Sequence, residues 1–253
     1  MQCYGVMNRT ALALILLLAA SAHAEDLKVP SDWKVVGIAV STSQLHALSS
    51  RETRRALDRA SETIEDELPG IRWHVARDIR SARFDDRDGP AIIDGVGFAR
   101  IVERLAGTDE EIAHASCVFL FAPLPDSTYS GMSAMLAHPA GKKAIPYSVV
   151  NTRQGHRFMG GFSQGMKALE RAFDRGPIRA FALHATTVHE FGHFLAPGGV
   201  MIGNGEDEPS KHDLACIMFT PKDRRSLLAK VREFPRLLQF CDKCRERLGC
   251  PER

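Results

Sequence analysis

The chain has 253 residues, of which 44% are hydrophobic and 25% are charged, an ordinary composition for a globular protein. A formal net charge of +2 argues against a protein that binds nucleic acid or another polyanion through a strongly basic surface. The sequence also contains no internal repeat and no low-complexity linker. We therefore expect a single folded domain rather than a repeat array or several linked modules.

The first 24 residues have the pattern of a secretory signal peptide. Arg9 gives a weakly positive start, and the apolar run at 11–20 is too short to span a bilayer comfortably. A small-x-small sequence ends at Ala24, so we expect cleavage there and a mature chain that begins at Glu25. The mature protein, residues 25–253, is then expected in the periplasm or outside the cell without a membrane anchor. An uncleaved anchor is the alternative.

Residues 25–196 alternate between predicted strands and predicted helices. Strands are expected at 33–40, 71–76, 115–121, 130–137 and 144–151. Helices are expected at 43–68, 98–105 and 166–173 and again from position 177, whereas the segment 77–95, rich in Asp, Arg and Gly, is expected to be a loop. The order predicts an α/β (α+β) fold with a twisted mixed sheet. A small helical lobe is expected at 197–253, with helices at 221–233 and 235–248.

The central motif is an H-E-x-x-H sequence made by His189, Glu190 and His193. Pro177 suits the first position of the helix that carries it, because proline lacks the N–H that would be unpaired there. Residues four apart share a helix face, so the two imidazoles can bind one metal ion. The adjacent carboxylate can then act as general base, which is the zincin arrangement. Two core histidines that flank a glutamate by chance would give the same letters.

A catalytic zinc ion usually has three protein ligands, so a third is expected beyond the helix. The helix should end at 197–199, where proline and two glycines cannot continue it. Position 199, where an extended H-E-x-x-H-x-x-G-x-x-H motif has its third histidine, is glycine. The next histidine is His212, which we predict as the third ligand. Asp213 and the glutamates at 206–208 are the rival ligands.

Further motifs follow His212, namely Cys216-Ile217-Met218 and the C-x-x-C pair of Cys241 and Cys244. Together with the H-E-x-x-H motif, residues 187–244 resemble the archaemetzincins and related bacterial metzincin-type zinc proteases. The resemblance implies a metzincin-like fold with Met218 in a turn under the metal. It implies the zinc ligands His189, His193 and His212 and the base Glu190. The chain differs from that family at Ala196 and Asp213, by an insertion before His212, and by a longer gap between Cys216 and Cys241.

Four cysteines lie close together near the C-terminus, at Cys216, Cys241, Cys244 and Cys250. Four thiols that include a C-x-x-C pair can hold a structural zinc ion, and the resemblance favours this second metal, with Cys250 in place of the cysteine missing at 213. An oxidising compartment instead favours two disulfides. A redox-active C-x-x-C pair is a third alternative, although no thioredoxin-like βαβ pattern surrounds it. Cys117 lies in an apolar run and is expected to be a buried core thiol.

The sequence therefore predicts an exported zinc metallopeptidase with a peptide or protein substrate. Zinc would polarise the scissile carbonyl and activate water, and Glu190 would move the proton. The resemblance implies that the strand at 130–137 lines the cleft and binds the peptide by strand addition. One alternative is a metzincin-like zinc-binding or protein-interaction module without catalysis. Another is a zinc hydrolase that acts on amides other than peptides.

Overall fold

A computed structural model describes residues 30–43, 45–84, 96–124, 131–136, 144–153, 176–195, 216–218 and 238–247. The predicted helices at 166–173 and 221–233 and most of the predicted lobe 197–253 lie outside these residues. None of the described helices is both long enough and apolar enough to cross a lipid bilayer.

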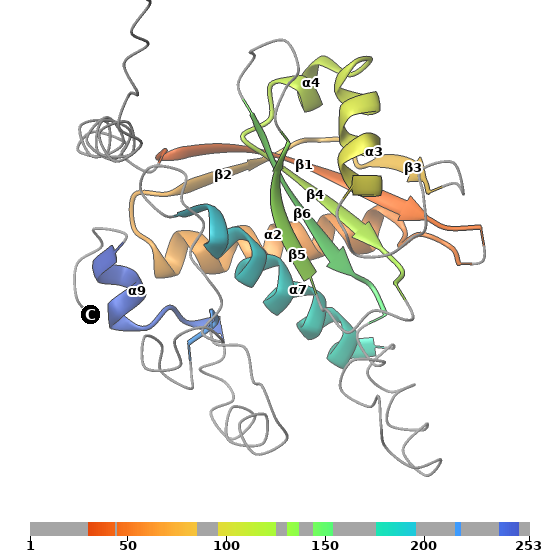
Figure 1. The fold of residues 1–253 in the computed structure, drawn as a ribbon. Coiled ribbons are helices and arrows are strands. Elements are labelled where there is room, and N and C mark those ends of the chain that lie inside the picture. Colours follow the sequence, from red (N-terminus) through yellow and green to blue (C-terminus); the bar gives the residue numbers. More distant parts are fainter. Residues whose placement is uncertain are drawn as a thin grey trace, which may run out of the picture.

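The described residues form a mixed α/β fold built on one mixed sheet of six strands (Figure 1). The strands are β1 (Asp32–Ser41), β2 (Arg72–Val75), β3 (Arg80–Arg83), β4 (Cys117–Ala122), β5 (Gly131–Leu136) and β6 (Ile145–Asn151). Their order is β2-β1-β4-β6-β5, with β3 paired to the second half of β1. All neighbours run parallel except β5, which is antiparallel to β6. Among the described strands, β5 is therefore an edge strand, and the predicted mixed α/β class is confirmed.

Helices cover both faces of the sheet, which explains why its central strand β4 is apolar throughout. The helices α2 (Ser50–Glu67) and α7 (Gly176–Gly192) pack on one face, around a core that includes Trp33, Phe119 and Val150. The helices α3 (Val96–Ala106) and α4 (Glu110–Ala113) pack on the other, around a core that includes Val118 and Val149. Because side chains alternate along a strand, neighbouring residues of β4 and β6 contribute to different cores.

Helix α2 begins at a capping box, which places its start later than the sequence pattern indicated. The Ser49 side chain accepts a hydrogen bond from the Glu52 N–H, and the Glu52 carboxylate accepts one from the Ser49 N–H at 3.1 Å. This reciprocal pair fixes the first helical residue at position 50 rather than near 43. The helix ends at Glu67 with Leu68 as its C-cap, and Gly70 takes the positive φ of 101° that turns the chain towards β2.

The segment 77–95 was expected to be a loop, but residues 80–83 form the strand β3. The polar sequence of this strand shows no apolar alternation, because the strand is stabilised by backbone pairing with β1 and by an ion pair. The Arg80 guanidinium lies 2.8 Å from the Asp109 carboxylate, and Asp109 also caps the unpredicted helix α4. Near the C-terminus, helix α9 (Asp242–Arg247) is shorter than the predicted helix at 235–248.

Phe191, inside the H-E-x-x-H motif, anchors α7 to the rest of the core. Its ring is fully buried and meets Trp33 and Trp73 edge-on, with ring centroids 4.8 Å and 4.5 Å away. Trp73 in turn contacts Phe119 of the central strand β4. Edge-to-face aromatic pairs combine large buried area with a preferred orientation. This cluster therefore fixes both the position of α7 and its rotation about its own axis.

We expect Phe191→Ala to lower the free energy of unfolding by about 3–5 kcal/mol, since it removes a large buried ring that the two tryptophans cannot replace. Phe191→Leu, which keeps most of the apolar volume, should cost clearly less. Urea unfolding followed by circular dichroism measures both variants. Equal midpoints for the parent and the alanine variant would mean that the aromatic cluster does not hold this helix.

Candidate metal centre and active site

The H-E-x-x-H motif lies at the C-terminal end of α7 and continues into a 3₁₀ turn at His193–Leu195. The predicted helical spacing is thus confirmed for both histidines. The rings of His189 and His193 have centroids 5.0 Å apart and planes at 84°. One ligand atom each from His189, Glu190 and His193 lies within 4.8 Å of the others. Such a group of two imidazoles and a carboxylate is able to hold a metal ion.

The Ile217 carbonyl holds His189 in a tautomer that suits a metal ligand. Its Nδ1 atom lies 2.7 Å from the backbone carbonyl oxygen of Ile217. A carbonyl can only accept, so Nδ1 carries the hydrogen and Nε2 is the nitrogen with the lone pair for a metal. A backbone carbonyl that orients a ligand histidine in this way is typical of metal sites. The Ile217 N–H donates to the Gln239 carbonyl at 2.8 Å, which fixes the segment that supplies this oxygen.

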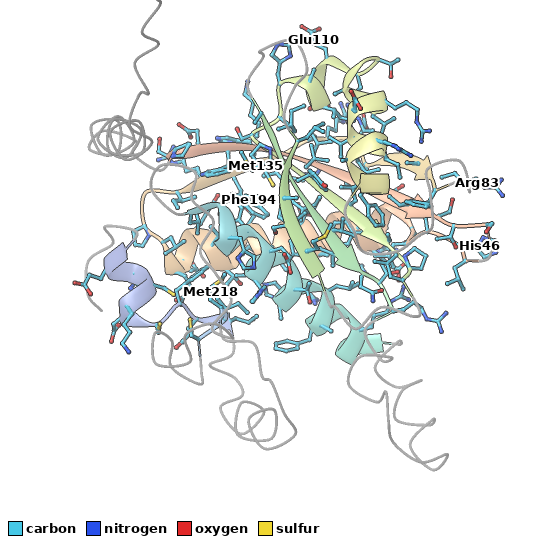
Figure 2. The ribbon with its side chains drawn as sticks, in the orientation of Figure 1. His46, Arg83, Glu110, Met135, Phe194 and Met218 are labelled. Atoms are coloured by element: carbon cyan, nitrogen blue, oxygen red, sulfur yellow. The ribbon has the colours of Figure 1, made fainter. Side chains whose placement is uncertain are left out.

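Met218 follows that carbonyl and packs against the motif helix. The side chain is fully buried, between α7 and the segment that leads to α9 (Figure 2). A Cβ atom on Gly192 would overlap the Met218 Sδ atom and lie 3.1 Å from the Phe240 ring. Glycine at 192 is therefore what allows the methionine to approach the helix between the two histidines. The structure thus places Met218 beside the predicted metal ligands.

Glu190 points away from solvent, towards the edge strand β5. The residue is 3% exposed, and its Oε2 atom accepts a hydrogen bond from the Ser133 hydroxyl at 2.7 Å. A Cβ atom on Gly131 would overlap the same carboxylate. The strand at 130–137 was expected along the cleft, but its contacts with Glu190 could not be predicted, because Ser133 lies 57 residues before Glu190 and Gly131 lies further still. Both meet Glu190 only through the packing of α7 on β5.

The structure separates His184 from the predicted metal ligands. Its Nε2 atom lies 2.9 Å from the Thr63 hydroxyl of α2, and its ring is outside the cluster of His189, Glu190 and His193. Burial lowers the pKa of His184, and the positive charge of Arg59 lowers it further. This histidine is neutral at physiological pH and serves the contact between α2 and α7. The predicted third ligand His212 and its rivals Asp213 and 206–208 lie outside the described residues.

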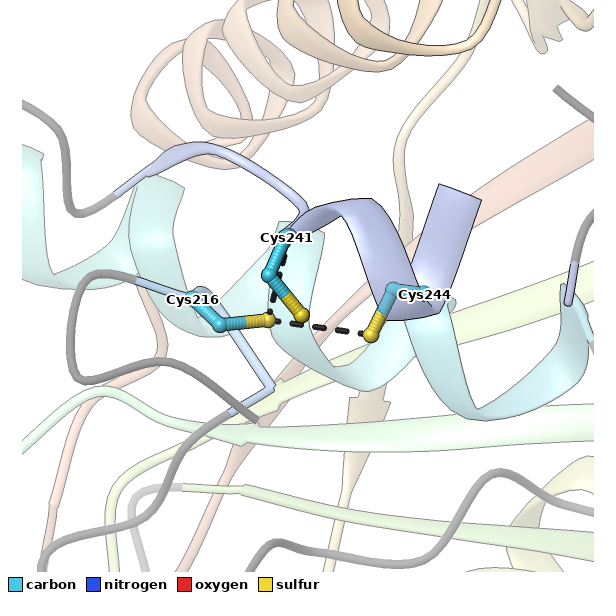
Figure 3. A group of neighbouring side chains, drawn as sticks. All are labelled: Cys216, Cys241 and Cys244. Carbon is cyan, nitrogen blue, oxygen red and sulfur yellow. Dashed lines mark hydrogen bonds between the residues drawn. The ribbon is translucent and has the colours of Figure 1, made fainter. Parts of the chain in front are cut away.

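Three of the four cysteines near the C-terminus lie together in a second cluster, namely Cys216, Cys241 and Cys244 (Figure 3). Their sulfur atoms all lie within 4.8 Å of one another, and the Cys216 and Cys244 sulfurs are 3.7 Å apart. A disulfide would need about 2.05 Å, and none joins the described cysteines. Three thiols in contact are able to hold a metal ion such as zinc. The fourth residue of the predicted set, Cys250, lies outside the described residues.

The thiols of this cluster resist ionisation when no cation is near. The hydrogen bond with Cys241 and burial raise the pKa of Cys216 to about 11, and contacts with both other thiols raise the pKa of Cys244 much further. Metals bind the thiolate, so loading the cluster must release protons and is weaker at low pH. Cys117 is separate and fully buried in β4, where burial raises its pKa. The prediction of a core thiol there is confirmed.

No protein-family model matches this chain, and no curated protein matches it.

We expect His189→Ala, His193→Ala and His212→Ala each to weaken zinc binding by more than the 10–100-fold typical of losing an outer partner, because each removes a ligand atom. His184→Ala should leave zinc affinity unchanged, because that ring binds Thr63 instead. Competition titration with a chromophoric chelator measures all four variants. Unchanged affinity in His212→Ala would assign the third ligand to Asp213 or to 206–208.

We expect the parent to bind two zinc ions per chain and to lose one of them when its thiols are alkylated. The cysteine cluster would lose its ligands, whereas the histidine cluster has no thiol. Elemental analysis of the purified protein gives both numbers, and Cys117→Ala, which removes a thiol outside the cluster, is the control. A single zinc ion together with four oxidised cysteines would establish two disulfides instead.

Proposed function

We propose that this chain is an exported zinc-dependent metallopeptidase of the metzincin type. The observation that carries the proposal is the convergence of two imidazoles and one buried carboxylate, with the His189 tautomer set by the Ile217 carbonyl. The proposed ligands are His189 and His193, with His212 as the third. The predicted signal peptide at residues 1–24 supports a location in the periplasm or outside the cell.

The donor chemistry of the site fits zinc better than the hard cations. Neutral imidazole nitrogen is a good zinc ligand, whereas calcium and magnesium prefer sets of oxygen atoms. When bound, zinc polarises a carbonyl and makes a water molecule acidic at neutral pH. An orienting hydrogen bond such as that of His189 raises the basicity of the ligand and supports this role. The cysteine cluster would hold a second, structural zinc ion.

Glu190 is the proposed general base. It is adjacent to one ligand, and a carboxylate oxygen lies within 4.8 Å of the histidine nitrogens, near enough to contact a water molecule between them. In peptide hydrolysis the carboxylate takes a proton from the attacking water and gives it to the leaving amine. A zinc site with only a structural role has no need of such a base. This argues for catalysis over a zinc-binding module that lacks it.

The edge strand β5 is the proposed binding site for the peptide. Within the described sheet it pairs only with β6, so the main-chain groups on its other side are available to an added strand. The strand passes directly beside Glu190 through Gly131 and Ser133. Met135, at 44% exposed, offers an apolar surface on the same strand. An extended peptide bound here would have its backbone close to the proposed base.

We expect Glu190→Gln to keep its zinc and to lower the hydrolysis of a fluorescence-quenched peptide library by about 10²–10⁴-fold, because only the proton acceptor is removed. The assay compares kcat/KM at equal zinc content. Glu103→Gln, on an exposed position of α3 across the sheet, is the matched control and should equal the parent.

Equal rates in Glu190→Gln and the parent would remove Glu190 as the base. A parent that binds zinc tightly but cleaves no peptide in the library would favour the zinc-binding module or a hydrolase for other amides.

A further inference from the structure

Two serines lie directly opposite each other on β5 and β6, under the motif helix. The register pairs Ser133 with Ser148, and their hydroxyl oxygens are 2.8 Å apart. Met132 and Ala134 beside Ser133, and Tyr147 and Val149 beside Ser148, all belong to the core on the other face. Alternation therefore places both serines on the face covered by α7. Ser148 is fully buried. Burying a hydroxyl group lowers the stability of the fold unless the hydroxyl is hydrogen-bonded, so the hydrogen-bond partners of this pair matter.

That partner is Glu190. The Ser133 hydroxyl oxygen lies 2.7 Å from the Glu190 Oε2 atom and 3.0 Å from the Glu190 backbone oxygen. A hydroxyl has a single hydrogen, and its contact with the carboxylate oxygen is the shorter of the two. The hydrogen of Ser133 therefore goes to the carboxylate, and the Ser148 hydroxyl donates to the Ser133 oxygen. The result is a chain of bonds from Ser148 through Ser133 to Glu190, in which each bond strengthens the next.

Gly131 completes the surroundings of the carboxylate. A Cβ atom there would lie 2.7 Å from both Cγ and Cδ of Glu190 and would overlap Oε1. The positive-φ glycines of the described chain are Gly70 and Gly176, so the backbone at Gly131 does not itself require glycine. The absence of a side chain at 131 instead leaves the space that the carboxylate occupies. One carboxylate oxygen is thus tied to Ser133 while the other lies against bare backbone.

We propose that Ser133, supported by Ser148, positions the Glu190 carboxylate for proton transfer, and that Gly131 provides the room for that position. This inference rests on the proposed function, since it assigns the residues that orient its base. A glutamate has three side-chain torsions, and a base must keep its oxygen within hydrogen-bond reach of the proton that it takes. The hydrogen bond from Ser133 holds the carboxylate in a position where one of its oxygen atoms stays near the histidine nitrogens. Ser133 is a positioning residue, because its hydroxyl acts through the Glu190 carboxylate.

The test measures kcat, KM and zinc content of the zinc-loaded full-length protein with the same peptide library. Ser133→Ala should lower kcat by about 10–100-fold, the usual effect of losing an orienting partner, at unchanged KM and zinc content. Ser133→Thr keeps the hydroxyl and should restore kcat to within a few-fold of the parent. Ser148→Ala should cause a smaller loss, because Ser133 can still donate. Gly131→Ala should lower kcat by displacing the carboxylate.

Ser41→Ala is the matched control for a strand serine that loses one hydrogen bond. Its hydroxyl donates to the Ala82 carbonyl at 3.4 Å, between β1 and β3. This bond lies towards the edge of the sheet opposite β5. This variant should keep the kcat of the parent. A merely structural role for Ser133 would lower the thermal midpoint without a selective effect on kcat, and threonine would then give no kinetic rescue.

The outcomes separate this inference from the proposed function. Full kcat in Ser133→Ala, in a protein that Glu190→Gln inactivates, would overturn the positioning role and leave the peptidase standing. A crystal structure of the zinc-loaded parent provides a readout that needs no activity. Glu190 should accept a hydrogen bond from Ser133 there, and a carboxylate turned away from β5 would overturn the inference even if peptides are cleaved.

Discussion

The edge-on contact of Phe191 with Trp33 and Trp73 is the constraint on which the site depends. Successive residues of a helix point about 100° apart, so fixing one of them fixes the directions of its neighbours. With Phe191 directed into the aromatic core, Glu190 faces β5 and Gly192 faces Met218. The two histidines converge on one side of the helix. The hydrophobic core thereby sets the orientation of every polar group in the motif.

The C-terminal segments are attached to this core through a second set of contacts. The Glu67 carboxylate, at the end of α2, accepts a hydrogen bond from the Phe240 N–H at 3.2 Å. Arg245 of α9 donates to the Glu67 carbonyl oxygen and so satisfies a helix-terminal acceptor. Cys216 then pairs with Gln239 and immediately precedes the residue that orients His189. A metal ion or a covalent link at the cysteine cluster would therefore be connected, through Ile217, to the candidate metal ligand His189.

The sequence predicted those elements whose formation depends mainly on local hydrophobic periodicity. The buried strands and the helix that bears the histidines have strong periodicity, and the structure places them within a few residues of expectation. Strand β3 was missed because its residues are polar and its stability comes from β1 and from the pairing of Arg80 with Asp109. The bond from His189 to the Ile217 carbonyl and the Ser133–Ser148 pair were equally invisible. They depend on strand register and helix packing, which the sequence does not state. The third ligand His212, outside the described residues, stays a prediction.

The two positions written as x in H-E-x-x-H are each constrained by the structure of this chain. Phe191 sets the rotation of the helix, and Gly192 admits a methionine sulfur where a single added carbon would not fit. A five-residue graft onto another helix would therefore transfer the ligand atoms without the geometry that makes them useful. The new helix would also need neighbours equivalent to Trp33 and Trp73, a glycine equivalent to Gly131, and a backbone carbonyl equivalent to that of Ile217. The smallest portable unit of this centre is thus a three-dimensional one, drawn from α7, two strands and the segment around Met218.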